Sequence, residues 1–369
     1  MRIAVVANTS WYLYNFRRNL MREIRAAGHD VLAVGSADEY AQRLAQDGWS
    51  HVAVPFTGGG VNPLREARTV WALWRLLRRR RIDLVLSYTP KGNIYTGLAA
   101  RAAGLPFLPN ISGLGRVFIR RSALTWLVLS LYRATLRHAP AVFFQNDDDR
   151  DAFVRARIVD PSRAVRVPGS GVDLAHFQPP PARPQVAPFR FLMVARLLWD
   201  KGVGEYVEAA RQIRRERPEV RFGLLGMSAG DHPAAVPATQ IAAWQSEGAI
   251  DFLGATDDVR PYLASADCVV LPSSYPEGVP RSLLEAAAMA RPVVTTDAPG
   301  CRDVVDNGVT GFVCRPRDAL DLAAALRRVL ALSAEERHRM GLRGRQKMER
   351  EFDERQVIRA YLAAIDALR

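Results

Sequence analysis

One pattern runs through the whole chain: short apolar stretches alternate with segments that have the apolar spacing of helices. This alternation is typical of βα units, in which helices cover a parallel sheet. Residues 179–188 interrupt it, because five prolines in this stretch exclude a helix and a central strand. A chain of 369 residues is long enough for two cores. We therefore expect an α/β protein of two facing Rossmann-like domains, with a ligand cleft at the carboxyl ends of the strands.

The same pattern predicts where the elements lie. The predicted strands are 3–7, 30–34, 51–56, 84–88, 107–111, 141–145 and 164–167, then 189–195, 221–225, 250–253, 268–272, 292–296 and 311–314. The predicted domains are 1–178, a stiff linker at 179–188, a second domain at 189–350, and a C-terminal helix at 351–369 that packs back on the first domain.

The net charge of +13 is concentrated in the first half of the chain. Residues 1–180 contain 25 Lys and Arg against 13 Asp and Glu, whereas residues 181–369 contain 26 against 25. We expect the first half to face an anionic partner: nucleic acid, an acidic lipid surface or a phosphorylated acceptor.

Cysteine usage and the N-terminus indicate the compartment. The three cysteines have no metal-site spacing, and the first residues lack the charged start of a signal peptide. No apolar run reaches the about 18 to 20 residues that span a bilayer. We expect a cytoplasmic protein that is peripherally associated with the inner face of the cell membrane.

The most informative segment follows the predicted strand 268–272. It reads Pro276-Glu277-Gly278-Val279-Pro280-Arg281-Ser282 and leads into an apolar helix that contains Glu285. A tight turn and a helix N-terminus present backbone N–H groups and a positive dipole end, which suit a phosphate or a sugar oxygen. The two glutamates can accept hydrogen bonds from sugar or ribose hydroxyls.

A second polar segment follows the predicted strand 189–195. Arg196 comes directly after that strand, and Lys201 and Gly202 precede the next helix. Two cations in this position suit a diphosphate. Because fixed positive charge stabilises a leaving group that gains negative charge, no metal ion is then required.

With these motifs the chain resembles family 4 of the retaining glycosyltransferases, which have the GT-B fold. The family has the E-x7-E pattern of Glu277 and Glu285 and the R-x4-K-G pattern of Arg196 and Lys201. The resemblance implies that Glu277 lies by the donor sugar and Glu285 binds the nucleotide ribose. It also implies that Arg196 and Lys201 neutralise the leaving diphosphate. Further donor-binding residues implied by it are Gly278, Val279, Pro280, Arg281, Ser282, Gly226, Met227, Phe252 and Leu253.

The first half resembles those members that act on polyprenyl-diphosphate-linked sugars. The resemblance lies in segments 87–93 and 110–115, with Pro90 where those members often have histidine. Asp173 lies in a G-V-D-x3-F segment of the family, and it also suits a turn or cap. The acceptor-binding residues that the resemblance implies are Lys91, Asn93, Ser112, Gly113, Gly115, Arg116 and Asp173.

Two basic and apolar stretches of the first half are candidates for membrane contact. Residues 69–81 form a basic amphipathic pattern with Trp71 and Trp74, and residues 116–138 have a basic start and an apolar middle. Each stretch also suits a helix that buries its apolar face on a sheet. For residues 116–138 we favour interfacial contact.

Other motifs are weaker. Gly226-Met227-Ser228-Ala229-Gly230 has the G-x-S-x-G spacing of a hydrolase, but prolines follow where that motif requires a helix. Asp147-Asp148-Asp149 contains a D-x-D metal motif, yet acids also suit a helix start. Two other functions stay open: a UDP-sugar epimerase on the same fold, and a basic protein that binds nucleic acid or membrane without catalysis.

Together, the residues and the resemblance predict a retaining hexosyl- or N-acetylhexosaminyltransferase. Its expected partners are a UDP-sugar, a polyprenyl-diphosphate-linked saccharide acceptor, and an anionic membrane surface that contacts the first domain. Its expected setting is bacterial surface-glycan or glycoprotein-glycan assembly. No cofactor, no metal and no nucleic acid are expected.

Overall fold

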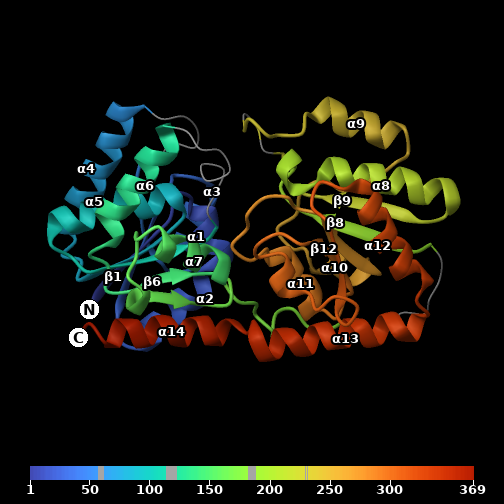
Figure 1. Cartoon of the computed structure of the whole chain (residues 1–369). Coiled ribbons are helices and arrows are strands. Elements are labelled where there is room, and N and C mark those ends of the chain that lie inside the picture. Colours follow the sequence, from blue (N-terminus) through green and yellow to red (C-terminus); the bar gives the residue numbers. More distant parts are fainter. Residues whose placement is uncertain (57–61, 114–122, 182–187, 229, 231) are drawn as a thin grey trace. The chain divides into compact units, whose positions relative to one another are not determined.

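The computed structural model describes residues 1–56, 62–113, 123–181, 188–228, 230 and 232–369. They form two compact units, Met1–Ser170 together with Arg355–Arg369, and Gly171–Glu354 (Figure 1). Each unit contains one parallel sheet, so the expected fold class of two Rossmann-like α/β domains is confirmed. All the predicted strands are present, with ends that differ by at most a few residues.

The first unit is built on a seven-stranded sheet in the order β3-β2-β1-β4-β5-β6-β7. Its strands are β1 (Arg2–Val6), β2 (Asp30–Gly35), β3 (Ser50–Ala53), β4 (Leu84–Tyr88), β5 (Phe107–Ile111), β6 (Val142–Phe144) and β7 (Ala164–Arg166). Its α-helices are α1 (Ser10–Phe16), α2 (Arg18–Ala26), α3 (Glu39–Gln46), α4 (Pro63–Arg79), α5 (Pro90–Ala103), α6 (Ala123–Leu136), α7 (Asp147–Arg155) and α14 (Glu354–Asp366). The strand order reverses between β1 and β4, which makes that sheet edge a natural ligand site.

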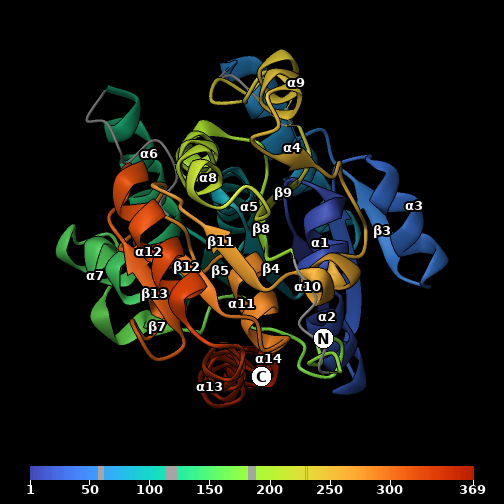
Figure 2. The ribbon, with the colours of Figure 1, turned by 90° about the vertical axis from the view of Figure 1, so that its right-hand side faces the viewer.

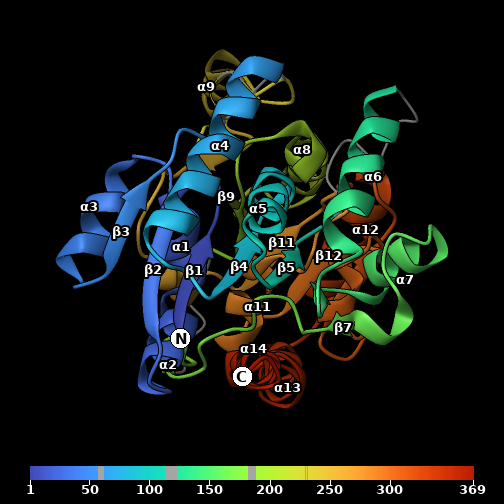
Figure 3. The same cartoon turned by 90° about the vertical axis from the view of Figure 1, so that its left-hand side faces the viewer.

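Helices cover both faces of the first sheet. Helices α4, α5 and α6 lie side by side on one face, with α5 in the middle (Figure 3). Apolar residues of α2 and α14 pack against the other face, in a cluster with Val5 and Leu86. Within the described parts of the chain, no helix combines the length and apolar character needed to cross a bilayer.

The second unit repeats this architecture with six strands in the order β10-β9-β8-β11-β12-β13 (Figure 2). Its strands are β8 (Arg190–Val194), β9 (Arg221–Leu225), β10 (Asp251–Phe252), β11 (Cys268–Leu271), β12 (Val293–Thr296) and β13 (Gly311–Cys314). Its α-helices are α8 (Val203–Glu216), α9 (Ala238–Ser246), α10 (Arg260–Ser265), α11 (Arg281–Ala288), α12 (Ala319–Ala331) and α13 (Ala334–Glu351). Here the order reverses between β8 and β11.

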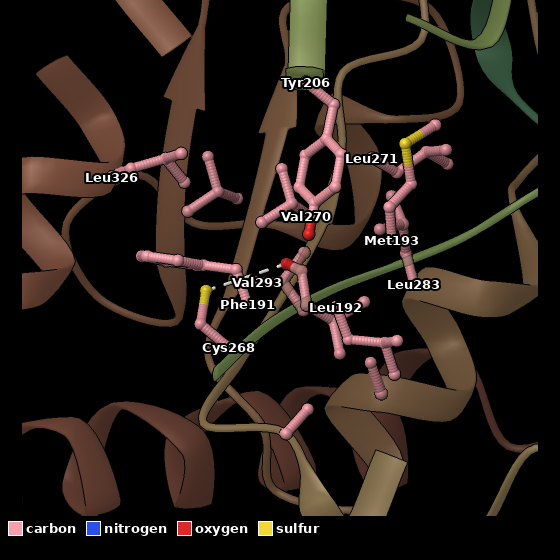
Figure 4. Close-up of a cluster of buried hydrophobic side chains, with 14 of the residues drawn as sticks. Phe191, Leu192, Met193, Tyr206, Cys268, Val270, Leu271, Leu283, Val293 and Leu326 are labelled. Atoms are coloured by element: carbon pink, nitrogen blue, oxygen red, sulfur yellow. Dashed lines mark hydrogen bonds between the residues drawn. The ribbon is translucent and has the colours of Figure 1, made fainter. Parts of the chain in front are cut away.

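The core of the second unit gathers around β8 and β11. Phe191, Val270 and Tyr206 of α8 are fully buried there (Figure 4). The Tyr206 hydroxyl donates a hydrogen bond to the Gly223 carbonyl at 3.0 Å, which satisfies its polar group inside an apolar cluster. Cys268 is buried in the same cluster, and burial raises the pKa of its thiol. We therefore expect the thiol to remain protonated and unreactive.

The segment after β7 belongs to the second unit. Val172 pairs with Asp353, and Phe177 is buried in the second core. Arg345 of α13 donates hydrogen bonds to the carbonyls of Phe177 and Leu174 at 2.7 and 3.3 Å. The first unit thus ends at Ser170, whereas the sequence pattern placed its end at 178. The sequence pattern placed the domain boundary at the prolines. The contacts of Phe177 and Arg345 instead place this segment in the second unit.

The C-terminal helix α14 packs on the first unit. Tyr361 is fully buried and stacks on Phe143 of β6, with ring centroids 4.2 Å apart. Val357 and Ile365 join the same apolar cluster. The last residues of the chain therefore complete the core of the domain that the first residues begin.

We predict that Tyr361→Ala lowers the free energy of unfolding by about 3 kcal/mol, because it removes a fully buried ring from this core. Urea unfolding followed by circular dichroism measures the change. The control is Arg359→Ala, an exposed position on the same helix, which we expect to change the free energy by less than about 0.5 kcal/mol. Equal effects of the two variants would contradict the packing of α14.

Candidate functional site

The polar motifs of the second unit meet at the carboxyl edge of its sheet. Lys201 follows β8 and Glu277 follows β11, and these two strands are neighbours in the sheet. The order of strands reverses between them, so the loops after β8 and β11 diverge to opposite faces and leave room at the edge. Because the two strands are neighbours, residues 76 positions apart still come into contact at the strand ends.

A glycine makes this contact close. Gly202 has φ +80°, and a Cβ atom there would lie 2.1 Å from the Pro272 carbonyl oxygen. No other residue type fits both the left-handed backbone and the contact with the end of β11. The backbone N–H of Ser274 donates to the Asp200 carbonyl at 3.0 Å and joins the two turns.

Glu277 accepts bonds from two partners. The ammonium of Lys201 forms an ion pair with its Oε1 atom, and the hydroxyl of Ser273 donates to the same oxygen at 3.0 Å. The side chains of Lys201 and Glu277 are 15% and 12% exposed, so both are largely shielded yet reachable from solvent. The Tyr275 ring lies 5.9 Å from the ammonium. The cation and the carboxylate are thus held at one position, ready for a polyanionic and hydroxylated ligand.

Glu285 lies one turn along α11 from Arg281. The Nε atom of Arg281 donates to Glu285 Oε1 at 3.0 Å. Burial raises the pKa of the Glu285 carboxyl, and the positive charge of Arg281 opposes that shift. Helix α11 begins after Pro280 with no side-chain cap and no acid in its first turn. Its N-terminus therefore keeps the positive dipole end that favours an anion.

Gly278 and Val279 lie in the turn after β11 and Ser282 lies in the first turn of α11, whereas the other predicted donor residues lie at the ends of β8, β9 and β10. Arg196 is exposed directly after β8. A Cβ atom at Gly226 would lie 1.7 Å from the Ala195 carbonyl oxygen, so β8 and β9 end in close backbone contact. Met227 and Leu253 are exposed, whereas Phe252 lines a small pocket of about 280 Å³ together with Leu197 and residues of α9.

Three residues of this edge were missed by the sequence analysis. Ser273 supports Glu277, and Thr296 of β12 donates a hydrogen bond to the Ser273 carbonyl. Gly300 has φ +77°, and a Cβ atom there would lie 2.1 Å from the Gly278 carbonyl oxygen. A Pro-Gly pair shortly after a predicted strand was the only signal for Gly300.

In the first unit, Lys91 lies in the first turn of α5, beyond the carboxyl end of β4. Its ammonium pairs with Glu66 of α4 at 2.9 Å. Burial and a hydrogen bond to Glu66 raise the pKa of the neighbouring Tyr95 hydroxyl. The residue before the helix, Thr89, has φ +69° and gives no side-chain cap. A β-branched residue in this region is strained, and such strain is concentrated at ligand sites.

Asn93 is buried and bonded to neighbouring strands of the first sheet. Its Oδ1 atom accepts from the Ser87 hydroxyl at 2.6 Å, and its Nδ2 atom donates to the Asn110 carbonyl at 2.8 Å. Of the other predicted acceptor residues, Ser112 and Gly113 follow β5, and Gly113 has φ +106°. Gly115 and Arg116 lie outside the described residues.

Asp173 lies in the second unit, where its carboxylate closes a turn. Its Oδ1 atom accepts the backbone N–H groups of Ala175 and His176 at 3.0 and 2.9 Å. These two bonds are those expected of a turn or cap residue.

The G-x-S-x-G motif is not followed directly by a helix, and the D-x-D motif forms the start of one. After Gly230, helix α9 starts only at Ala238, so Ser228 lacks the immediate helix that a nucleophile elbow requires. Asp147, Asp148 and Asp149 form the first turn of α7, and Asn146 caps that helix by accepting the Asp149 N–H at 2.8 Å.

Two protein-family profiles match the chain, one within each of the two structural units. A profile for "Glycosyl transferases group 1" matches residues 188–332, and a profile for "Glycosyl transferase 4-like domain" matches residues 15–170. The first match contains the whole edge formed by Lys201, Glu277 and Glu285. The second contains the β4–α5 turn with Lys91.

Two curated relatives align with most of this chain. The N,N'-diacetylbacillosaminyl-diphospho-undecaprenol alpha-1,3-N-acetylgalactosaminyltransferase of Campylobacter jejuni is 26% identical over 99% of this chain and 98% of its own length. The UDP-Gal:alpha-D-GlcNAc-diphosphoundecaprenol alpha-1,3-galactosyltransferase of Escherichia coli is 25% identical over 75% of this chain and 73% of its own length.

Solved structures share the fold. Anabaena Alr3699/HepE in complex with UDP and glucose superposes with a TM-score of 0.82 at 19% identity, and the match covers 100% of both chains. A glycosyltransferase from Rickettsia africae superposes with a TM-score of 0.79 at 17% identity, over 100% of this chain and 98% of that one.

We predict that Gly202→Ala lowers the free energy of unfolding of the second unit by at least about 3 kcal/mol, because it adds both backbone strain and a clash with Pro272. The control is Gly248→Ala, where φ is +75° but the nearest atom to a Cβ is the Arg214 side chain at 3.8 Å. That control isolates the cost of the left-handed backbone, about 1 kcal/mol. Urea unfolding measures both, and equal losses would show that the contact with β11 is not required.

Proposed function

Because the chain belongs to the glycosyltransferases with a group 1 domain and a 4-like domain, we propose that it is a retaining enzyme that transfers a hexose or N-acetylhexosamine from a UDP-sugar to a polyprenyl-diphosphate-linked saccharide. The observation that carries the proposal is the cluster of Lys201, Glu277 and Ser273 beside the N-terminus of α11. The relatives are named as transferases, which does not favour the epimerase or the non-catalytic alternatives.

The second unit binds the donor in this proposal. Lys201 and Arg196 bind the diphosphate, and the N-terminus of α11 adds its positive dipole end. Glu285 accepts hydrogen bonds from the ribose, and Glu277 orients the sugar. The apolar pocket beside Phe252 lies at the strand end where the resemblance puts the base.

The reaction then needs no nucleophile from the protein. The bond between the anomeric carbon and the diphosphate breaks, and a bond from the same face to the acceptor oxygen forms. The acceptor proton passes to the leaving diphosphate oxygen. As the diphosphate gains negative charge, Lys201 can shift from Glu277 toward it, so its stabilisation is greater in the transition state than in the ground state.

The first unit binds the acceptor in this proposal. Lys91 lies at the strand reversal of the first sheet, at the N-terminus of a helix with no acid in its first turn. A cation and a helix N-terminus together suit a lipid-linked diphosphate. Both relatives described above are named for diphospho-undecaprenol substrates, which supports this acceptor class.

A lipid-linked acceptor places the enzyme at a membrane. We propose peripheral association with the anionic inner face of a bacterial membrane, through the first unit, in surface-glycan or glycoprotein-glycan assembly. The charge supports this, since residues 1–180 contain 25 cationic against 13 acidic side chains. We also propose that transfer requires no metal, because Arg196 and Lys201 supply positive charge to the diphosphate.

The function is tested with a panel of UDP-sugars and a polyprenyl-diphosphate-linked N-acetylhexosamine, in buffer with EDTA. We expect a glycosylated lipid with the anomeric configuration of the donor, detected by mass spectrometry and nuclear magnetic resonance. Saturating UDP, at 100 times its Kd, should stabilise the protein by about 2.7 kcal/mol in a thermal shift assay. Stabilisation by GDP instead would change the donor. Stabilisation by NAD, or no product with any UDP-sugar, would contradict the proposal.

We predict that Lys201→Ala lowers kcat/KM at least about 100-fold, because it removes a donor to the charge that develops on the leaving diphosphate. Arg215→Ala, an exposed cation on α8, is the matched control and should leave kcat/KM within twofold. Normal turnover of Lys201→Ala would remove this residue from the mechanism.

A further inference from the structure

The exposed apolar side chains of the first unit gather on two helices. Leu64 and Trp71 of α4 are 83% and 53% exposed, and Trp126 and Leu127 of α6 are 66% and 52% exposed. Among the residues described in the first unit, these four are the large apolar side chains that face solvent. We call them the α4–α6 surface.

The two helices present these residues at the same side of the first unit. Both pack against α5, one on each side of it (Figure 3). Three of the four residues, Leu64, Trp126 and Leu127, lie in the first turns of their helices, which follow the carboxyl ends of strands. The fourth, Trp71, lies two turns along α4. The rest of each helix buries its apolar side chains, for example Leu73 and Tyr132, against the sheet.

This part of the sequence is rich in positive charge. Residues 67–146 contain thirteen Lys and Arg and a single acid, Asp83, whose carboxylate accepts the Arg2 backbone N–H at 2.6 Å. The exposed cations of α4 are Arg65, Arg68, Arg75, Arg78 and Arg79. The acid of that helix, Glu66, is buried and pairs with Lys91. The Arg75 guanidinium lies over the Trp71 ring, 5.1 Å from its centroid.

The combination selects one kind of partner. Tryptophan side chains favour the headgroup region of a bilayer, where the ring is shielded and its N–H still meets water. Arginines are attracted to anionic lipid headgroups. A nucleic acid would use the same arginines but would gain nothing from an 83% exposed leucine.

We propose that the α4–α6 surface docks on an anionic bilayer, with Trp71 and Trp126 inserted at headgroup depth and the arginines of α4 against lipid phosphates. The proposal deepens the membrane association proposed above by assigning it to named side chains. It also links membrane docking to acceptor binding. Glu66, in the first turn of the docking helix α4, pairs with Lys91, the proposed acceptor-binding residue in the first turn of α5. A lipid-linked diphosphate lies at headgroup level, so docking brings that group toward Lys91.

Vesicle co-sedimentation of the full chain tests the surface. The vesicles contain phosphatidylcholine with or without 30% phosphatidylglycerol as the anionic lipid. The test variant is Trp71→Ala with Trp126→Ala, and the matched control is Leu320→Ser, a 70% exposed apolar residue of the second unit. We expect the double variant to partition at least about tenfold more weakly into the anionic vesicles and the control to match the wild type.

Brominated lipids give a second readout, measured at a lipid concentration that binds all of each variant. Quenching of tryptophan fluorescence by lipids brominated near the headgroup should fall in the double variant and stay unchanged in Leu320→Ser. Charge is tested separately with Arg65→Glu and Arg68→Glu, which should weaken binding to the anionic vesicles. Circular dichroism melting verifies that each variant is folded.

The outcomes distinguish failure of the docking proposal from failure of the proposed transfer reaction. Wild-type binding by the double variant, or a wild-type dimer that the double variant breaks, would overturn the bilayer assignment. Binding to anionic vesicles that needs the arginines but not the tryptophans would overturn the insertion. Transfer to a short-chain, water-soluble acceptor measures the proposed reaction without any membrane. Absence of this transfer would contradict the proposed function, whereas the vesicle experiment tests the docking surface independently.

Discussion

The contact between the turn after β8 and the end of β11 determines the geometry of the second unit's site. Gly202 allows that turn to approach the Pro272 carbonyl, and Lys201 is thereby held against Glu277. The end of β12 is tied to the same place, because Thr296 donates to Ser273 and Gly300 lies against Gly278. Three strand ends are thus joined by two close backbone contacts and one hydrogen bond from a buried threonine, which leaves them little freedom to move. A site built this way is rigid where, in the proposed reaction, a diphosphate and a sugar are oriented.

Paired charges are the second common feature of the molecule. Lys201 pairs with Glu277, Arg281 with Glu285, and Lys91 with Glu66. In each pair both side chains are largely buried, so an unpaired member would carry a large desolvation cost. A phosphate has more negative charge than one carboxylate and can compete for the cation. The pairs therefore hold long side chains in position and leave them exchangeable, which suits substrates that arrive and leave as polyanions.

The two units share a fold but differ in surface chemistry. The second has nearly balanced charge and a site made from strand-end loops, whereas the first combines excess positive charge with exposed apolar residues on α4 and α6. This division follows from what each unit binds in the proposed reaction. A nucleotide-sugar is soluble and is recognised by local hydrogen bonds, whereas a lipid-linked acceptor stays in a bilayer and has to be met at its surface. In the proposed reaction, bilayer contact explains why Trp71 and Trp126 of the first unit are exposed.

The sequence by itself determined the strands, the fold class and the motifs of the proposed donor site, because alternation of apolar residues and the spacing of Glu277, Glu285, Arg196 and Lys201 are local properties. Only the tertiary structure decided which residues meet. Lys201 and Glu277 are 76 positions apart, and their pairing depends on the order of strands in the sheet. Asn93 is bonded to the Asn110 carbonyl, because its position in α5 turns it toward β5. Likewise, Trp71 is exposed while Leu73 is buried, since the packing of α4 on the sheet selects which face of the helix reaches solvent.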